Sequence, residues 1–112
     1  MNYFVTNDER IGTCYHEFFK GKWDGETFWK ADSLCLDDDL LCEYRAFGNA
    51  ILSVIPSYSP FGITEISPEQ WKAIGKQIAA DGDNIVLEMY READAWVQDV
   101  FSTYDCFTIL GI

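Results

Sequence analysis

The segment "ITEISPEQWKAIGKQI", residues 63–78, decides the predicted fold class because it joins a strand pattern to a helix start within a few residues. Residues 63–67 alternate between apolar and polar side chains, which is typical of a short strand. Ser67 can cap a helix whose first residue is Pro68, and Gln70 can complete a capping box. The apolar residues that follow at helical spacing are Trp71, Ile74 and Ile78. The segment therefore predicts a strand followed by a helix to about residue 80.

Downstream of this segment the pattern predicts one more helix and one more strand. Residues 86–101 keep helical spacing for roughly four turns. Trp71 and Trp96 fall on the apolar faces of these two helices, so we expect both indoles in the core. The last seven residues, "CFTILGI", are rich in β-forming side chains and predict a strand.

Upstream, residues 36–54 predict another helix, which ends before Pro56. Its apolar side chains recur at intervals of three and four residues, and the aspartates at 37–39 fall at its start. Residues 22–33 contain turn-forming residues and large aromatic side chains that follow no helical or strand periodicity. We therefore expect an ordered aromatic loop there. Residues 56–62 predict a second, turn-rich loop.

The N-terminal segment predicts a strand and a first helix. Residues 3–6 form a short β-rich run that stops at Asn7. Asn7 can then cap a helix that ends before Gly21. The residues that follow one helical face are Ile11, Cys14, Tyr15, Phe18 and Phe19.

These elements run in the order β-α-α-β-α-α-β and occupy a single domain, residues 1–112. With about four helices and a few short strands, the sequence predicts a mainly helical α+β fold with one small sheet. At 112 residues the chain is long enough to bury one core without a metal or disulfide.

The charge of the chain is its most unusual property. Nineteen acidic side chains against eight basic ones give a net charge of −11. Residues 24–44 hold seven acids and one base, and residues 81–112 hold the same numbers. Eighteen aromatic side chains indicate a folded globule rather than a disordered acidic segment. The large negative net charge argues against direct binding to nucleic acid or to an anionic membrane.

The N-terminus shows no signal-peptide pattern and the chain has no membrane-spanning apolar run, so we expect a cytoplasmic protein. Its four cysteines are then most simply reduced thiols. A zinc site is disfavoured because there is no CxxC pair and His16 is the only histidine. On the predicted first helix, His16 is expected on the polar face beside the apolar stripe.

The carboxylates do not match a calcium loop or a catalytic pair. An EF-hand loop that starts at Asp37 would need glycine where Cys42 stands, and one that starts at Asp81 would need it at Val86. Successive residues at a helix start point about 100° apart, which does not suit a coupled acid and base. The chain has no GxSxG, P-loop or GxGxxG motif. We therefore expect no metal, no cofactor and no enzymatic activity.

The acidic segment 24–44 instead predicts an interaction surface. Capping the helix that begins near residue 38 uses one carboxylate, Asp37 or Asp38, and leaves the other acids unexplained. Trp23 and Trp29 lie in the aperiodic loop, and tryptophan is enriched at binding hot spots. The candidate partner-binding residues are Trp23, Asp24, Glu26, Trp29, Asp32, Asp37, Asp38, Asp39 and Glu43.

The C-terminal half also resembles a known family. The segments "ITEISPEQWKAIGKQI", "EMYREADAWVQDVF" and "CFTILGI", within residues 63–112, resemble the small immunity proteins of bacterial contact-dependent growth inhibition systems, the CdiI type. The resemblance implies a cytoplasmic protein that neutralises the C-terminal toxin of a partner CdiA protein, often a nuclease acting on tRNA or DNA. It implies no particular site residues, because contact surfaces differ between cognate pairs.

Charge and resemblance together predict an immunity protein that binds a basic toxin domain, with acidic side chains in the place of phosphates. Two alternatives remain open from the sequence. One is a nucleic-acid mimic that blocks DNA-binding proteins generally. The other is a small enzyme with an unrecognised site. A mimic would bind many basic nucleases, whereas an immunity protein would bind one.

Overall fold

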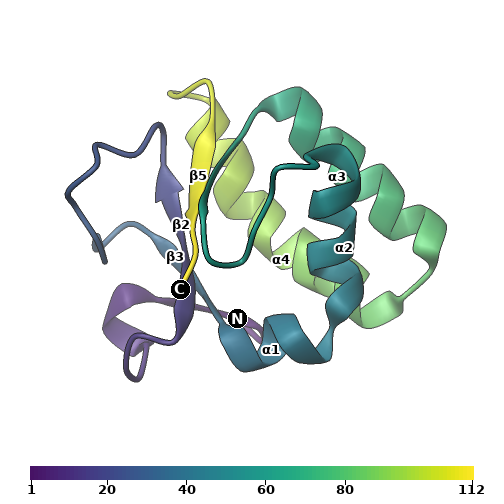
Figure 1. The fold of residues 1–112 in the computed structure, drawn as a ribbon, viewed down its shortest axis with the longest axis horizontal. Coiled ribbons are helices and arrows are strands. Elements are labelled where there is room, and N and C mark those ends of the chain that lie inside the picture. Colours follow the sequence, from purple (N-terminus) through teal and green to yellow (C-terminus); the bar gives the residue numbers. More distant parts are fainter.

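A computed structural model describes residues 1–112 (Figure 1). A helical half, with α2, α3 and α4, packs beside a sheet. The elements in chain order are β1 (Phe4–Thr6), a 3-10 turn (Asn7–Glu9), β2 (Tyr15–Lys20), β3 (Leu34–Asp37), α1 (Asp38–Glu43), α2 (Arg45–Val54), β4 (Ile63–Ile66), α3 (Pro68–Asp81), α4 (Asn84–Phe101) and β5 (Phe107–Leu110).

The sheet has five antiparallel strands in the order β1-β3-β2-β5-β4. Its central strand is β2, in which Phe18 pairs with Leu34 of β3 and with Ile109 of β5. Strands from both ends of the chain therefore meet in the middle of the sheet. Because β1 and β4 are the edges, the two short outer strands carry the unpaired backbone groups.

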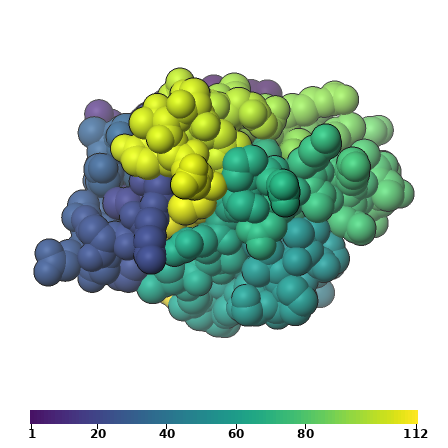
Figure 2. All heavy atoms as spheres, turned by 90° about the horizontal axis from the view of Figure 1, so that it is seen from above, coloured from purple at the N-terminus to yellow at the C-terminus, as the bar shows by residue number.

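One face of the sheet packs against the helices and forms the core. The ring of Phe107 stacks on Phe18, with centroids 5.5 Å apart, and meets Trp71 of α3 edge-on at 5.4 Å. The other face is covered by the connections that flank β2, the purple and blue segments on the left of Figure 1. Figure 2 shows the same division, with blue residues on one side, teal and green helices on the other, and the yellow C-terminal segment between them.

The helix start at α3 is confirmed in detail. The Ser67 hydroxyl accepts the amide of Gln70 at 3.2 Å, and the Gln70 side-chain oxygen accepts the amide of Ser67 at 2.9 Å. Pro68 occupies the first turn, where a missing N–H costs nothing. The helix ends at Gly82, whose φ of 80° suits glycine.

The predicted first helix is wrong, because residues 15–20 form β2. All of "YHEFF" is buried, so both faces of the strand are covered and no two-residue alternation is visible in the sequence. Ile11, the first residue of the expected apolar stripe, is 88% exposed. Tyrosine and phenylalanine favour strands, and this preference decides the local structure once β3 and β5 flank the segment.

The predicted helix over residues 36–54 is right only from residue 38 onward. Its first residues belong to β3, and the helical part divides at Tyr44 into α1 and α2. Leu36 keeps helical spacing with the later apolar residues, but it is buried on β3 opposite Phe4. The aromatic loop over 22–33 and the strand within 63–67 are confirmed.

The fold class is confirmed as a mainly helical α+β single domain with four helices and one sheet. The order of elements differs from the prediction, since three strands precede the first helix. None of the helices combines the length and apolar character that a membrane crossing requires.

The two helical tryptophans provide a test of the core. Trp71 is 1% exposed, whereas Trp96 is only partly buried against the core. We expect Trp71→Ala to lower the free energy of unfolding by about 3–5 kcal/mol through the lost contacts and the cavity. Trp96→Ala should cost clearly less. Urea denaturation followed by circular dichroism measures both, and equal losses would contradict this assignment of the core.

Candidate functional site

The structure divides the nine predicted partner-binding residues into two groups. Five lie on the β2–β3 connection: Trp23, Asp24, Glu26, Trp29 and Asp32. Four lie at the end of β3 and on α1: Asp37, Asp38, Asp39 and Glu43. Asp32 lies in the turn before β3 and Asp37 is the last residue of β3, so the length of this strand separates the two groups. They are therefore not one continuous acidic cluster.

The β2–β3 connection is attached to the sheet by one buried carboxylate. Glu17 of β2 is 1% exposed. Its two oxygens accept the backbone amides of Trp29 at 2.8 Å and Lys30 at 3.1 Å, and the hydroxyl of Ser33 at 2.6 Å. A buried carboxylate that receives three hydrogen bonds is well compensated for its desolvation. The loop conformation thus depends on this side chain.

Two of the loop residues have local structural roles. The Asp24 carboxylate accepts the amides of Glu26 and Thr27 at 2.9 and 2.8 Å and the Thr27 hydroxyl at 2.5 Å. These bonds, led by the Thr27 hydroxyl, lower the pKa of Asp24 to about 2. The Trp23 indole N–H donates to the Thr27 carbonyl at 2.7 Å. The Glu26 carboxylate is exposed and has no such contact.

Trp29 and Asp32 are also engaged by neighbouring side chains. The Arg10 guanidinium lies 3.9 Å from the centre of the Trp29 ring. Asp32 lies 4.0 Å from the Lys20 ammonium, at the outer limit of an ion pair, and its carbonyl accepts the indole N–H of Trp96 at 2.9 Å. The exposed aromatic of this loop is Phe28, at 53%, which the sequence did not single out.

The three successive aspartates have three different environments. Asp37 caps α1 by accepting the amide of Asp39 at 2.9 Å, which confirms the capping prediction. Asp38 Oδ1 lies 2.7 Å from His16 Nε2, which is hydrogen-bond distance. Asp39 and Glu43 are exposed, and their carboxylates form no hydrogen bond or ion pair within the chain.

His16 is not on a polar helix face, and that part of the sequence interpretation is wrong. It lies on β2, is 1% exposed, and contacts Asp38 through Nε2 while its Nδ1 has no partner. The helix prediction prevented the recognition of His16 and Glu17 as buried polar residues. On a strand, these two neighbours point their side chains to opposite faces. A strand assignment for residues 15–20 would have identified both as buried polar groups that need partners.

Most carboxylates have no basic side chain within 4 Å. The exceptions are Asp38, which lies beside His16, and Asp32 and Asp99, which lie beside Lys20. On α4, Glu92 instead accepts the backbone amides of Asn2, Tyr3 and Phe4 at 2.7–2.9 Å and so holds the start of β1.

The groups suited to metal or thiol chemistry are dispersed. No group of three or more His, Cys, Asp or Glu side chains is placed so that it could hold a metal ion. All four cysteines are free thiols, with Cys14 and Cys42 exposed and Cys35 buried. Burial raises the pKa of Cys35 to about 11, and burial together with Asp38 raises the pKa of Cys42. Raised thiol pKa values disfavour the thiolate, which is the nucleophilic form.

Comparison with known proteins gives no match to any family model, curated protein or solved structure.

The Asp38–His16 pair gives the first test of the site. We expect Asp38→Ala to lower the free energy of unfolding by about 3 kcal/mol, because it leaves a buried histidine without its one partner. Asp39→Ala removes the same charge one residue later and should change stability by less than about 0.5 kcal/mol. Chemical denaturation of the two variants measures the difference. Equal losses of stability in Asp38→Ala and Asp39→Ala would show that the contact between Asp38 and His16 has no structural role.

A second test addresses the loop. Glu17→Ala leaves the amides of Trp29 and Lys30 and the hydroxyl of Ser33 without their acceptor, so residues 22–32 should become mobile. Limited trypsin digestion should then cut at Lys22 or Lys30 at least tenfold faster than in the native protein. Glu26→Ala, on the same loop but without contacts to the sheet, is the control. Unchanged protection in Glu17→Ala would contradict this role of the carboxylate.

Proposed function

We propose that this chain is an immunity protein that binds and neutralises a basic toxin domain, of the nuclease type found at the C-terminus of CdiA proteins. The observation that carries the proposal is the number of exposed carboxylates without an internal partner, such as Glu26, Asp39 and Glu43. Self-repulsion of this size opposes folding and is compensated when a cation-rich surface covers it.

The negative charge of the exposed acids suits a nuclease partner. A nuclease groove is positive because it meets phosphates, and exposed carboxylates on an inhibitor can occupy the same positions. Complementary charge accelerates the encounter and disfavours other partners. The resemblance of residues 63–112 to CdiI proteins supports the same assignment.

The candidate acids differ in whether their charge can be removed without altering the fold. Asp24, Asp37 and Asp38 already accept hydrogen bonds within the chain, so neutralising them would alter the fold as well as the charge. Glu26, Asp39 and Glu43 can be changed without that complication. Glu26 belongs to the group on the β2–β3 connection, and Asp39 and Glu43 belong to the group on α1.

The test uses the triple variant Glu26→Gln, Asp39→Asn, Glu43→Gln and a candidate toxin domain, which is to be sought at the end of the neighbouring upstream gene. We expect the association rate at low salt to fall by about tenfold and its salt dependence to become shallower, because steering charge is lost. Stopped-flow fluorescence measures the rate. The native chain should also restore growth of cells that express the toxin.

A second triple variant, Glu69→Gln, Asp81→Asn, Asp105→Asn, removes the same charge from exposed positions on α3 and before β5. Its association rate should stay within about twofold of the native value. Equal effects of the two variants would place the interface elsewhere. Equally tight binding to a panel of unrelated basic nucleases would favour a general nucleic-acid mimic, and failure to bind the toxin domain would refute the proposal.

A further inference from the structure

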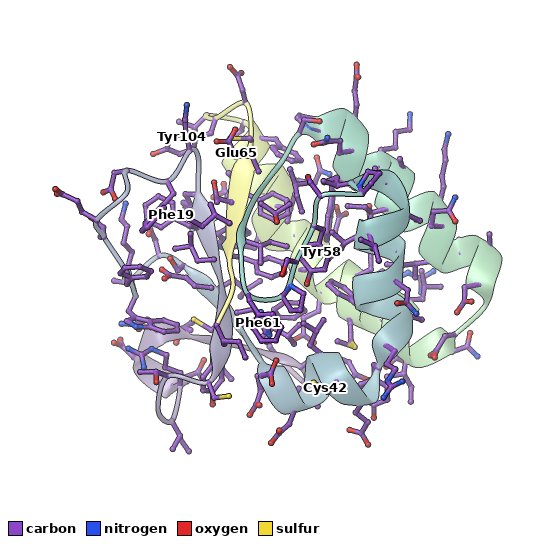
Figure 3. The ribbon with its side chains drawn as sticks, in the orientation of Figure 1. Phe19, Cys42, Tyr58, Phe61, Glu65 and Tyr104 are labelled. Atoms are coloured by element: carbon purple, nitrogen blue, oxygen red, sulfur yellow. The ribbon has the colours of Figure 1, made fainter.

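A cleft of about 340 Å³ opens between α1, α2 and the segment that precedes β4. In Figure 3, Phe61 lies between Tyr58 above it and Cys42 on α1 below it, and all three line this cleft. Ile112, the last residue, completes the wall. The volume falls within the range of sites that bury a ligand or a large side chain.

The cleft collects exposed apolar side chains from three separate parts of the chain. Leu52 on α2 is 46% exposed, Phe61 is 75% exposed and Ile112 is 41% exposed. Single exposed apolar residues are ordinary, but their convergence around a cavity is typical of a binding site.

The walls of the cleft are held by backbone hydrogen bonds. The amide of Ile112 donates to the carbonyl of Pro60 at 3.0 Å, and the amide of Gly111 donates to that of Gly62 at 2.8 Å. Tyr58 is fixed by its own amide, which donates to Ile55 at 2.9 Å. Because these walls are already ordered, little binding free energy is lost in ordering them when a ligand binds.

The cleft is also lined by a tyrosine hydroxyl and by a carboxylate. The Tyr58 hydroxyl has no hydrogen-bond partner within the chain, and burial, followed by the nearby Asp38 charge, raises the pKa of Tyr58 to about 12. The hydroxyl therefore remains a neutral donor. Asp38 lines the same cleft, and Asp39 and Glu43 are exposed on the same short helix. Arg45 is the one base among the lining residues.

We propose that the cleft receives one aromatic or long aliphatic side chain of the basic partner, next to lysine or arginine residues that meet the acids of α1. This inference rests on the proposed function, and it names the anchor residue type and its position. Hot spots in protein interfaces combine such a buried apolar anchor with charges at the rim. A second copy of this chain is a poor occupant, because two chains of charge −11 repel each other.

Gly48 allows the cleft to be filled without disturbing the core. A Cβ added there would lie 3.7 Å from Leu41 Cδ1 and 4.0 Å from Tyr58 Cε2, which is ordinary contact. Gly48→Leu therefore places a side chain in the cleft, and it also replaces a glycine inside α2, which favours the helix. A second variant, Phe61→Ser, removes an exposed wall residue. Its control is Ile11→Ser, at an apolar position that is 88% exposed, against 75% for Phe61, and that does not line the cleft.

The experiment titrates the chain with short lysine-rich peptides that contain one central tryptophan, to about 5 mM, because a single anchor gives weak affinity. Amide and methyl NMR shifts report the site. We expect saturable shifts at Leu52, Tyr58 and Phe61. We also expect at least fivefold weaker binding when alanine replaces the tryptophan or glutamate replaces the lysines. Gly48→Leu and Phe61→Ser should weaken the binding by the same factor, and Ile11→Ser should not.

Several results would overturn the inference: shifts centred elsewhere, equal binding of the alanine or glutamate peptides, or unchanged binding by folded Gly48→Leu and Phe61→Ser. The toxin domain separates this failure from that of the proposed function. If the toxin binds native chain and Gly48→Leu equally, the cleft is not the anchor, although the immunity function stands. If the peptides bind at the cleft and the toxin does not bind at all, the anchor site stands and the toxin assignment fails.

Discussion

The fold depends on two adjacent buried polar residues of the central strand, His16 and Glu17. Glu17 fixes the β2–β3 connection on one face through three hydrogen bonds, and His16 fixes the start of α1 on the other through Asp38. Each buried group would destabilise the fold without its partner. These contacts therefore determine the positions of the β2–β3 connection and of α1 relative to the sheet.

The same contacts separate structural acids from available ones. Asp24, Asp37 and Asp38 stabilise a turn, a helix start and a buried histidine, whereas Glu26, Asp39 and Glu43 have no internal partner. The hydrogen bonds hold the first three carboxylates in place, whereas the other three are exposed on the same segments. A preorganised surface of this kind loses little entropy on binding. The cleft beside α1 adds an apolar site next to those charges.

The fold class and the elements of the C-terminal half could be predicted from local patterns, because a capping box or an amphipathic helix is determined by residues that are close together in the sequence. The Ser67 cap and α4 are examples. The N-terminal half could not be predicted in the same way. The strand Tyr15–Lys20 is buried on both faces, so its pattern lacks alternation, and its partner β5 lies at the far end of the chain. The roles of His16 and Glu17 follow from that pairing and were missed with it.

The central claim is that the β2–β3 connection and α1, with the adjacent cleft, form the surface that meets a basic toxin. Hydrogen–deuterium exchange with and without the candidate toxin domain tests it most directly, since it reports protection along the whole backbone. The account predicts new protection in residues 22–32 and 38–49 and in the segment around Phe61. Protection confined to α3 and α4, with these segments unchanged, would contradict it.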